Sequence, residues 1–113
     1  MSKTLDRQEI KKRIQSIQRQ LSQLGSLRPG CLSLQYRKPK EKKGPYYQLS
    51  YTHQMRSRTE YIPSDLLAQI EQEIMEYHRY RELNQEWIEL SIQRSRLEIQ
   101  AWKKSKPRTR PAV

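Results

Sequence analysis

Leucine and tyrosine alternate with polar residues in two stretches near the middle of the chain. They take every second position of residues 32–36 and again of residues 47–51. A period of two is typical of strands that bury one face. Between the two stretches, Pro39 and the pair Gly44-Pro45 disfavour helix and supply turn residues. The pattern therefore predicts a β-hairpin, followed after a polar turn by a third short strand. The predicted strands, which form an antiparallel meander, are residues 31–37, 45–52 and 58–62.

The residues before this region follow a helical period. Asp6 and Glu9 have the spacing of a capping box, which indicates the start of a helix. Beyond them, isoleucine and leucine recur in alternating steps of four and three, the heptad spacing of a one-sided apolar seam. Gly25 is suited to end the helix. We therefore predict a helix over residues 6–24, with its seam at Ile10, Ile14, Ile17, Leu21 and Leu24.

A longer helix is predicted after Pro63. No glycine or proline occurs between Pro63 and Pro107, so a helix can continue over residues 64–104. Its apolar residues form two stripes that are out of phase, one in each half, which indicates two different packing roles. We expect the first half to pack against the sheet and the first helix, and the second half to contact another subunit. The residues predicted for that partner interface are Trp87, Leu90 and Leu97.

Together these elements predict an α+β fold, with an N-terminal helix, a three-stranded antiparallel meander and a long C-terminal helix. We expect residues 1–104 to form a single small domain and residues 105–113 to be a basic, disordered tail. Only 34% of the 113 residues are hydrophobic, so the core is small. With so small a core, we expect the fold to be stabilised by a partner: a second copy, a larger protein or a nucleic acid.

Basic charge is abundant and unevenly distributed. The formal net charge is +11. Residues 1–28, 29–62 and 101–113 each carry a net charge of +5, whereas residues 63–100 carry −4. A strongly basic surface favours a polyanionic partner, and the segregation of charge indicates a binding face.

The lysine-rich turn of the hairpin is the main candidate for contacting phosphates. A two-stranded ribbon fits the major groove of duplex DNA, and Tyr46, which alternation places on the face opposite Leu49, can stack on an unpaired base. Arginines of the next turn and strand extend the patch, and the C-terminal tail adds further cations. The lysines could instead form a solvated turn that only protects a sheet edge. The predicted nucleic-acid-binding residues are Arg37, Lys38, Lys40, Lys42, Lys43, Tyr46, Arg56, Arg58, Lys103, Lys104, Lys106, Arg108 and Arg110.

Several classes of protein are excluded by what the sequence lacks. The single cysteine, Cys31, allows no intramolecular disulfide and no Cys-rich zinc module, and His53 and His78 have no ligand spacing, so we expect no metal and no cofactor. A phosphate-binding loop and paired catalytic carboxylates are missing, so we expect no enzymatic activity. No apolar run approaches the roughly 18 residues of a membrane span, and no signal-peptide core follows the N-terminus, which gives a cytoplasmic location by default.

Several short motifs occur in an order that resembles a family of small uncharacterised bacterial proteins found around transposases and other mobile elements. The resemblance covers about residues 5–95. Many members of that family carry a cysteine-rich knuckle between the first two strands, where this chain has the lysine-rich segment 38–43. The resemblance implies a setting in a mobile element but supplies no activity. The motifs that carry it are Gly30-Cys-Leu, Tyr36-Arg-Lys, Gly44-Pro-Tyr-Tyr-Gln-Leu-Ser, Tyr61-Ile-Pro and Tyr77-His-Arg-Tyr-Arg.

These observations favour an accessory nucleic-acid-binding protein of a mobile element or defence system. It would contact the phosphates of DNA or RNA through the hairpin and tail and assist a larger enzyme or ribonucleoprotein. One alternative is a helical protein-interaction module that docks on a larger complex or forms a homodimer, with the basic charge serving solubility. Another is a small DNA-binding regulator, although no helix-turn-helix is evident.

Overall fold

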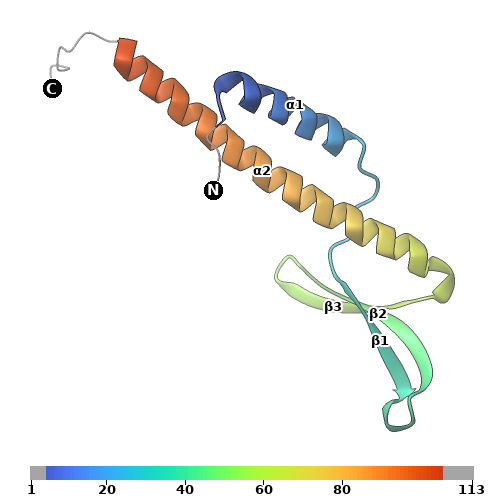
Figure 1. The fold of residues 1–113 in the computed structure, drawn as a ribbon. Helices are drawn as coiled ribbons and strands as arrows, with labels where there is room; N and C mark the ends of the chain where they lie inside the picture. Colours follow the sequence, from blue (N-terminus) through green and yellow to red (C-terminus); the bar gives the residue numbers. More distant parts are fainter. Residues whose placement is uncertain (1–4, 106–113) are drawn as a thin grey trace. The chain divides into compact units, whose positions relative to one another are not determined.

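The structure is a computed structural model that describes residues 5–105. These residues fall into two compact units, one with the chain up to Gln23 and from Glu82 onward, the other with Leu24–Arg81. The elements are a helix, three antiparallel strands and a long second helix (Figure 1), which confirms the predicted α+β class. A single domain over residues 1–104 stays a prediction, and the predicted tail lies outside the described residues except for Ser105.

Helix α1 (Arg7–Ser22) begins where the capping pattern predicts. The side chain of Asp6 accepts a hydrogen bond from the backbone N–H of Glu9 at 2.8 Å, and this bond lowers the pKa of the Asp6 carboxyl. The predicted end of the helix was wrong by two residues. The N–H of the C-cap residue Gln23 closes the last turn, so the helix stops before Gly25 is reached.

The core of the first unit forms between α1 and the second half of α2 (Leu67–Ser105), which run side by side (Figure 1). Ile10 and Ile17 of α1 and Leu83 and Leu90 of α2 are its buried residues. The structure thus differs from the prediction that α1 pairs with the first half of the long helix. Both halves carry an apolar stripe of helical period, and a stripe does not identify the segment that covers it.

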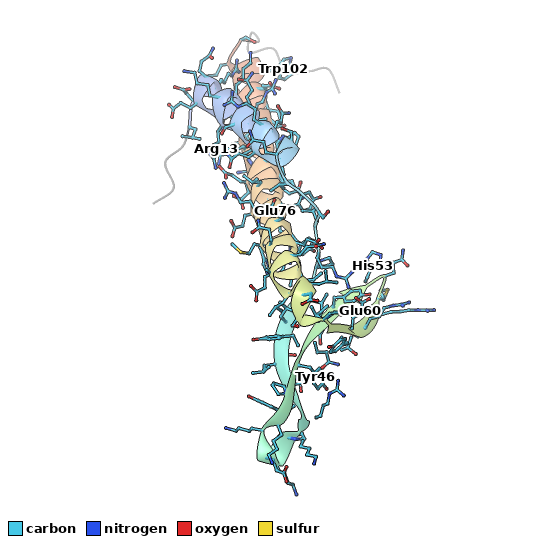
Figure 2. All side chains as sticks on the ribbon, turned by 90° about the vertical axis from the view of Figure 1, so that its right-hand side faces the viewer. Arg13, Tyr46, His53, Glu60, Glu76 and Trp102 are labelled. Carbon is cyan, nitrogen blue, oxygen red and sulfur yellow. The ribbon has the colours of Figure 1, made fainter. Side chains whose placement is uncertain are left out.

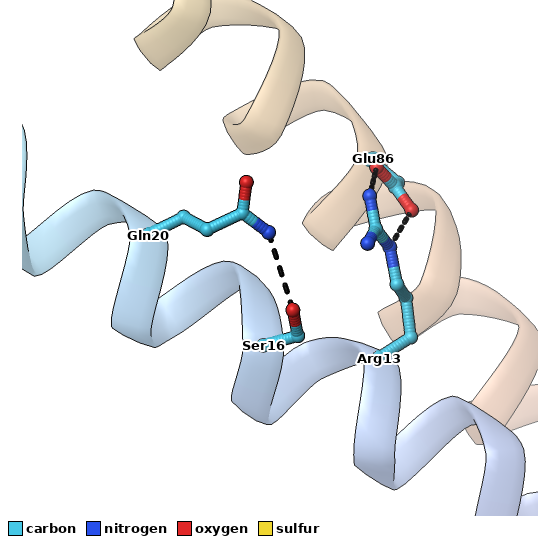
Figure 3. Close-up of polar contacts among 4 residues, drawn as sticks. All are labelled: Arg13, Ser16, Gln20 and Glu86. Atoms are coloured by element: carbon cyan, nitrogen blue, oxygen red, sulfur yellow. Dashed lines mark hydrogen bonds and ion pairs between the residues drawn. The ribbon is translucent and has the colours of Figure 1, made fainter.

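An ion pair fixes the register of the two helices of this unit. The guanidinium of Arg13 donates two hydrogen bonds to the Glu86 carboxylate, and the Nη2–Oε1 distance is 2.7 Å (Figure 3). This carboxylate raises the pKa of Arg13. Both side chains are more than a third exposed, so the bidentate geometry contributes more to alignment than to stability. At the start of α1, Arg7 Nη2 donates to the carbonyl oxygen of Leu97 at 3.3 Å.

The second unit contains an antiparallel sheet with the strand order β1-β2-β3, as predicted. The strands are slightly longer than the alternation alone predicts, because pairing continues to the base of each turn. They are β1 (Cys31–Lys38), β2 (Lys43–His53) and β3 (Arg56–Ile62). In the register, Leu49 lies between Leu32 and Glu60, and Gln48 lies between Ser33 and Tyr61. The two sets of residues face opposite sides of the sheet.

The face that carries Leu49 is covered. Leu49 is fully buried, and a Cβ atom added to Gly30 would lie 2.8 Å from its Cδ1, so the chain passes closely over it. Arg28 lies on this face, with its guanidinium carbon 4.3 Å from the ring centroid of Tyr51 and its Nη2 2.6 Å from Glu60. The Tyr51 hydroxyl also donates to Glu60, at 2.9 Å. This cluster joins the connection before β1 to the sheet.

The long helix starts later than the hydrophobic pattern predicts. A 3₁₀ turn, Ser64–Leu66, follows Pro63, and α2 then continues from Leu67 to Ser105. The backbone N–H of Arg28 donates to the carbonyl of Glu73 at 3.1 Å, which connects the start of α2 to the segment before β1. Within residues 5–105, no helix is both long and apolar enough to cross a membrane.

Candidate nucleic-acid interface

The tip of the β1–β2 hairpin presents a cluster of cations. The strands pair as far as Lys38 and Lys43, and the 3₁₀ turn Pro39–Glu41 connects them through Lys42, which adopts a left-handed conformation with φ 52°. All five cationic side chains of the tip are exposed, and Glu41 lies 3.9 Å from the ammonium of Lys43. Five cations and one carboxylate give a net charge of +4. The cationic residues of this cationic tip are Arg37, Lys38, Lys40, Lys42 and Lys43.

Gly44 positions Arg37 across the hairpin. A Cβ atom at Gly44 would lie 3.0 Å from the Arg37 Cβ and 3.2 Å from its Cγ, so the stem of Arg37 occupies the space that the missing side chain leaves. The φ of Gly44 is +68°, a region in which glycine is favoured. With its stem across Gly44, Arg37 brings its guanidinium carbon to 5.9 Å from the ring centroid of Tyr46. This distance is at the outer limit of a cation–π contact.

The face of the sheet opposite Leu49, here called the open face, carries Tyr46. Its ring lies 6.1 Å from that of Tyr61 on the neighbouring strand, with 40° between the ring planes. Tyr46 lies partway along the hairpin (Figure 2) and is half-buried, whereas Tyr61 is 59% exposed. Polar residues occupy the rest of this face, and Thr52 and Ser57 share a hydrogen bond of 3.2 Å at its far end. The open face is therefore polar except for two tyrosines.

The structure does not place Arg56 and Arg58 beside the cationic tip. Arg56 pairs with His53 at the β2–β3 turn, which lies at the opposite end of the sheet from the tip (Figure 2). The 11 residues of β2 separate the two ends by about 33 Å, at about 3.3 Å for each step along the strand. Arg58 is the partner of Tyr51 and so belongs to the face of Leu49. One patch that extends from the lysines to these arginines is therefore not formed.

The remaining predicted phosphate contacts belong to the other unit. Lys103 and Lys104 are exposed in the last turn of α2, where cations interact favourably with the helix dipole. Lys106, Arg108 and Arg110 lie outside the described residues. Binding of nucleic acid by any of these residues stays a prediction.

The three predicted interface residues of α2 lie against α1. Leu90 is 5% exposed in the core of the first unit, and Trp87 and Leu97 are half-buried around that core. A partner could reach Leu90 only by displacing α1. A different stripe of α2 remains exposed, formed by Ile88, Ile92, Ile99 and Trp102. Sequence reasoning missed this stripe because the competing stripe is richer in leucine.

Sequence reasoning also missed Tyr61, which only the strand register brings beside Tyr46. Alternation within residues 58–62 is sufficient to place the side chain of Tyr61 on the face of the strand that Ile62 does not occupy. Because Ile62 is buried, Tyr61 lies on the open face. The meander predicts which strand is the neighbour, but the register between the two strands could not be deduced from that pattern. Within the part of the chain that the structure describes, no group of three or more His, Cys, Asp or Glu residues could hold a metal ion. The open face and the tip offer cations, aromatic rings and hydrogen-bonding groups, which suit binding.

Comparisons with known proteins identify a family. No significant match occurs among curated proteins or among solved structures. A family model described as a domain of unknown function, DUF6788, matches residues 7–72, which is more than half of the chain. The match covers α1, the whole sheet and the start of α2. The chain belongs to the DUF6788 family.

Proposed function

We propose that this protein is an accessory nucleic-acid-binding protein that contacts backbone phosphates through the cationic tip. The observation that carries the proposal is the clustering of five exposed cations at the turn end of one hairpin, on the turn and the adjoining strand ends, with Glu41 as the one acidic residue of the tip. Each lysine or arginine that neutralises a phosphate releases counterions, which makes such binding favourable and sensitive to salt.

The distribution of charge supports the same proposal. Lys103 and Lys104 add exposed cations at the end of α2, and the sequence after Ser105 contains three more basic residues. Residues 63–100 are acidic, which leaves the basic charge on the hairpin, on α1 and near the C-terminus. Charge confined to separate segments favours an oriented complex over uniform coating of a polyanion.

A mobile element or defence system is the proposed setting. This part of the proposal rests on the resemblance of the Gly44-Pro-Tyr-Tyr and Tyr61-Ile-Pro motifs to proteins found around transposases. In such a setting, we expect the protein to assist a larger enzyme or ribonucleoprotein in engaging its DNA or RNA. It would act by adding affinity for the nucleic acid.

Salt-dependent binding tests the proposal. Five or six phosphate contacts give a log–log slope of roughly −4 to −5 for duplex DNA. Replacing Lys38, Lys40, Lys42 and Lys43 together by alanine should flatten that slope by about 3 to 4. Fluorescence anisotropy of a labelled duplex between low and physiological salt measures the slope. An unchanged slope in the variant would exclude the tip from the interface.

A matched pair of double variants controls for net charge. Lys40→Ala/Lys42→Ala and Lys11→Ala/Lys12→Ala each remove two exposed lysines, the first pair from the tip and the second from α1. We expect the tip variant to flatten the slope by about 2 and the α1 variant to change it by much less. Equal effects would mean that the protein attracts nucleic acid only through its total charge.

A second candidate function is self-assembly or docking through α2. It is favoured by the exposed stripe of Ile88, Ile92, Ile99 and Trp102, whose side chains are between 48% and 59% exposed. A depression of about 560 Å³ lies beside part of the stripe and is lined by Trp87, Ile88 and Ile92 among others. Apolar side chains exposed at helical spacing are typical of a helix that packs against another helix.

A further inference from the structure

We propose that Tyr46 and Tyr61 form a stacking platform for unpaired nucleobases on the open face of the sheet, so that the ligand of this surface is a single-stranded nucleic acid. The inference rests on the proposed function, because the cationic tip supplies the attraction for the backbone. It adds a second kind of contact, made to bases, and a preference between single and double strands.

The geometry of the two rings supports the platform. They come from adjacent strands, lie 6.1 Å apart and present their rings on the same side of the sheet. Tyr61 is 59% exposed, although Tyr47 and Tyr51 on the covered face are half-buried. A phenol ring offers a π surface to every base, and aromatic side chains on an exposed sheet face bind unpaired bases in this way.

Arg37 extends the platform toward the cationic tip. Its guanidinium lies over the ring of Tyr46, and its stem is held across Gly44. A planar guanidinium can stack on a base or pair with a phosphate. By alternation, Lys38 and Lys43 extend from the face of Leu49, whereas Arg37 shares the open face with the two tyrosines. A strand that leaves the turn at Lys40 and Lys42 and runs along the hairpin would therefore contact Arg37 and then the two tyrosines on one face.

Polar groups continue the open face beyond the tyrosines. A shallow depression of about 430 Å³ is lined in part by Cys31, Ser50, Thr59 and Ser57, which alternation places on the same side as Tyr61. Ser50 and Thr59 form a cross-strand pair and are both exposed. Hydroxyl groups at these positions can donate to or accept from the edges of bases whose pairing edges are free.

Duplex DNA does not fit this surface as well as a single strand. Bases in a duplex are stacked on one another and expose only their edges, so their faces are not available to a tyrosine ring. The lysines of the tip can contact the phosphates of either form. The tyrosines should therefore contribute affinity for the single strand alone.

The same pair of rings could serve only to stabilise the sheet, as cross-strand aromatic pairs do. Two observations distinguish a platform from that role. Tyr61 leaves more than half of its surface in water. The neighbouring residues on this face are polar, so the two rings are not part of a larger apolar cluster. A stabilising pair also predicts no preference among nucleic acids.

Equilibrium binding of three probes tests the inference with the full-length protein. The probes are an oligothymidine of about 15 nucleotides, an abasic deoxyribose-phosphate strand of the same length, and a duplex of that length. The two single strands carry the same backbone charge and differ in bases. We expect wild-type protein to bind oligothymidine at least about tenfold more tightly than the abasic strand, since stacking contributes roughly 5- to 150-fold per base.

Variants assign that preference to the two rings. Tyr46→Leu/Tyr61→Leu should abolish the preference for oligothymidine and leave duplex binding and the salt slope unchanged. Tyr46→Phe/Tyr61→Phe keeps both rings and should retain the preference. Tyr80→Leu, at a partly exposed tyrosine of α2, is the matched control and should behave as wild type. If the double leucine variant is unfolded by circular dichroism, Tyr61→Leu alone should reduce the preference about tenfold.

The outcomes separate this inference from the proposed function. Equal binding of oligothymidine and the abasic strand by wild-type protein would overturn the stacking platform and leave the phosphate-binding tip standing. A preference that survives Tyr61→Leu would also overturn it, because the bases would then be recognised elsewhere. Failure of all three probes to bind at low salt would overturn both proposals.

Discussion

At the scale of single residues, the hairpin depends on the absence of a side chain at Gly44. Gly44→Ala would place a Cβ atom 3.0 Å from that of Arg37, on a backbone with φ +68°. We expect the free energy of unfolding to fall by about 1–2 kcal/mol, because an L-residue is strained in this region and Arg37 must move. Urea denaturation followed by circular dichroism measures the change. Gly25→Ala is the matched control, since no atom lies within 4 Å of the added Cβ and no positive φ is required there. Equal losses would show that the close approach of Arg37 has no energetic consequence.

A second residue-scale prediction concerns the N-cap of α1. The pKa of Asp6 is lowered by the hydrogen bond from the Glu9 N–H. A lowered folded-state pKa means that the carboxylate stabilises the helix above its unfolded pKa, near 3.8, and that this contribution is lost as the pH falls through the folded-state pKa. We expect α1 to lose stability below about pH 4. Asp6→Asn keeps a capping oxygen that does not titrate, so this variant should lose less stability over the same range. Thermal melts of both proteins between pH 3 and pH 7 provide the comparison. Parallel melting curves at all pH values would show that the cap does not titrate with folding.

At the scale of elements, the β2–β3 turn is built from unusual residues. Gln54 and Met55 form a two-residue loop in which both have positive φ, 52° and 63°, and Met55 is exposed. Two-residue hairpin loops of this kind favour Asn-Gly. Gln54→Asn/Met55→Gly should therefore raise the free energy of unfolding by about 1 kcal/mol, because the left-handed strain is removed without loss of a buried contact. Chemical denaturation measures this change. Thr52→Ala/Ser57→Ala, which removes the adjacent hydroxyl pair, should lower the free energy of unfolding instead. A loss of stability in the Asn-Gly variant would show that this turn is held by other contacts.

The same elements show how far the sequence alone predicts the structure. Strands and helices were predicted because alternation and heptad spacing are local properties, visible without a partner. The Gln54-Met55 turn carries no glycine or asparagine, so its conformation could not be read from composition. The pairing of α1 with the second half of α2 depends on which stripe is nearest in space. The candidate site shows the same limit. The face on which Tyr46 lies was predicted from alternation, whereas the position of Tyr61 beside it required the register of β2 and β3.

At the scale of the whole molecule, the distribution of charge along the chain was predicted better than the arrangement of the charged segments in space. The basic segments were visible as counts along the chain, and the cationic tip lies where the lysine run predicts. The prediction that Arg56 and Arg58 lie near that tip was wrong, because an antiparallel strand carries the chain to the opposite end of the sheet before the next turn. Distances of this kind depend on strand length and pairing, which a list of charges does not contain.

Self-association is the prediction that belongs to the whole molecule. Ile88, Ile92, Ile99 and Trp102 lie at heptad spacing, with Ser95 at the intervening position, and their side chains are exposed. A helix whose second seam is apolar buries it most simply against the same seam of a second copy, since identical heptads match in register. We expect the protein to dimerise in sedimentation equilibrium at micromolar concentration, and Ile92→Lys/Ile99→Lys to make it monomeric with unchanged helicity. Met75→Lys, at an exposed position of α2 outside the seam, controls for added charge and should leave the dimer intact. A wild-type protein that stays monomeric at high concentration would contradict self-association. A monomeric variant that still binds nucleic acid through the cationic tip would show that the two surfaces act independently.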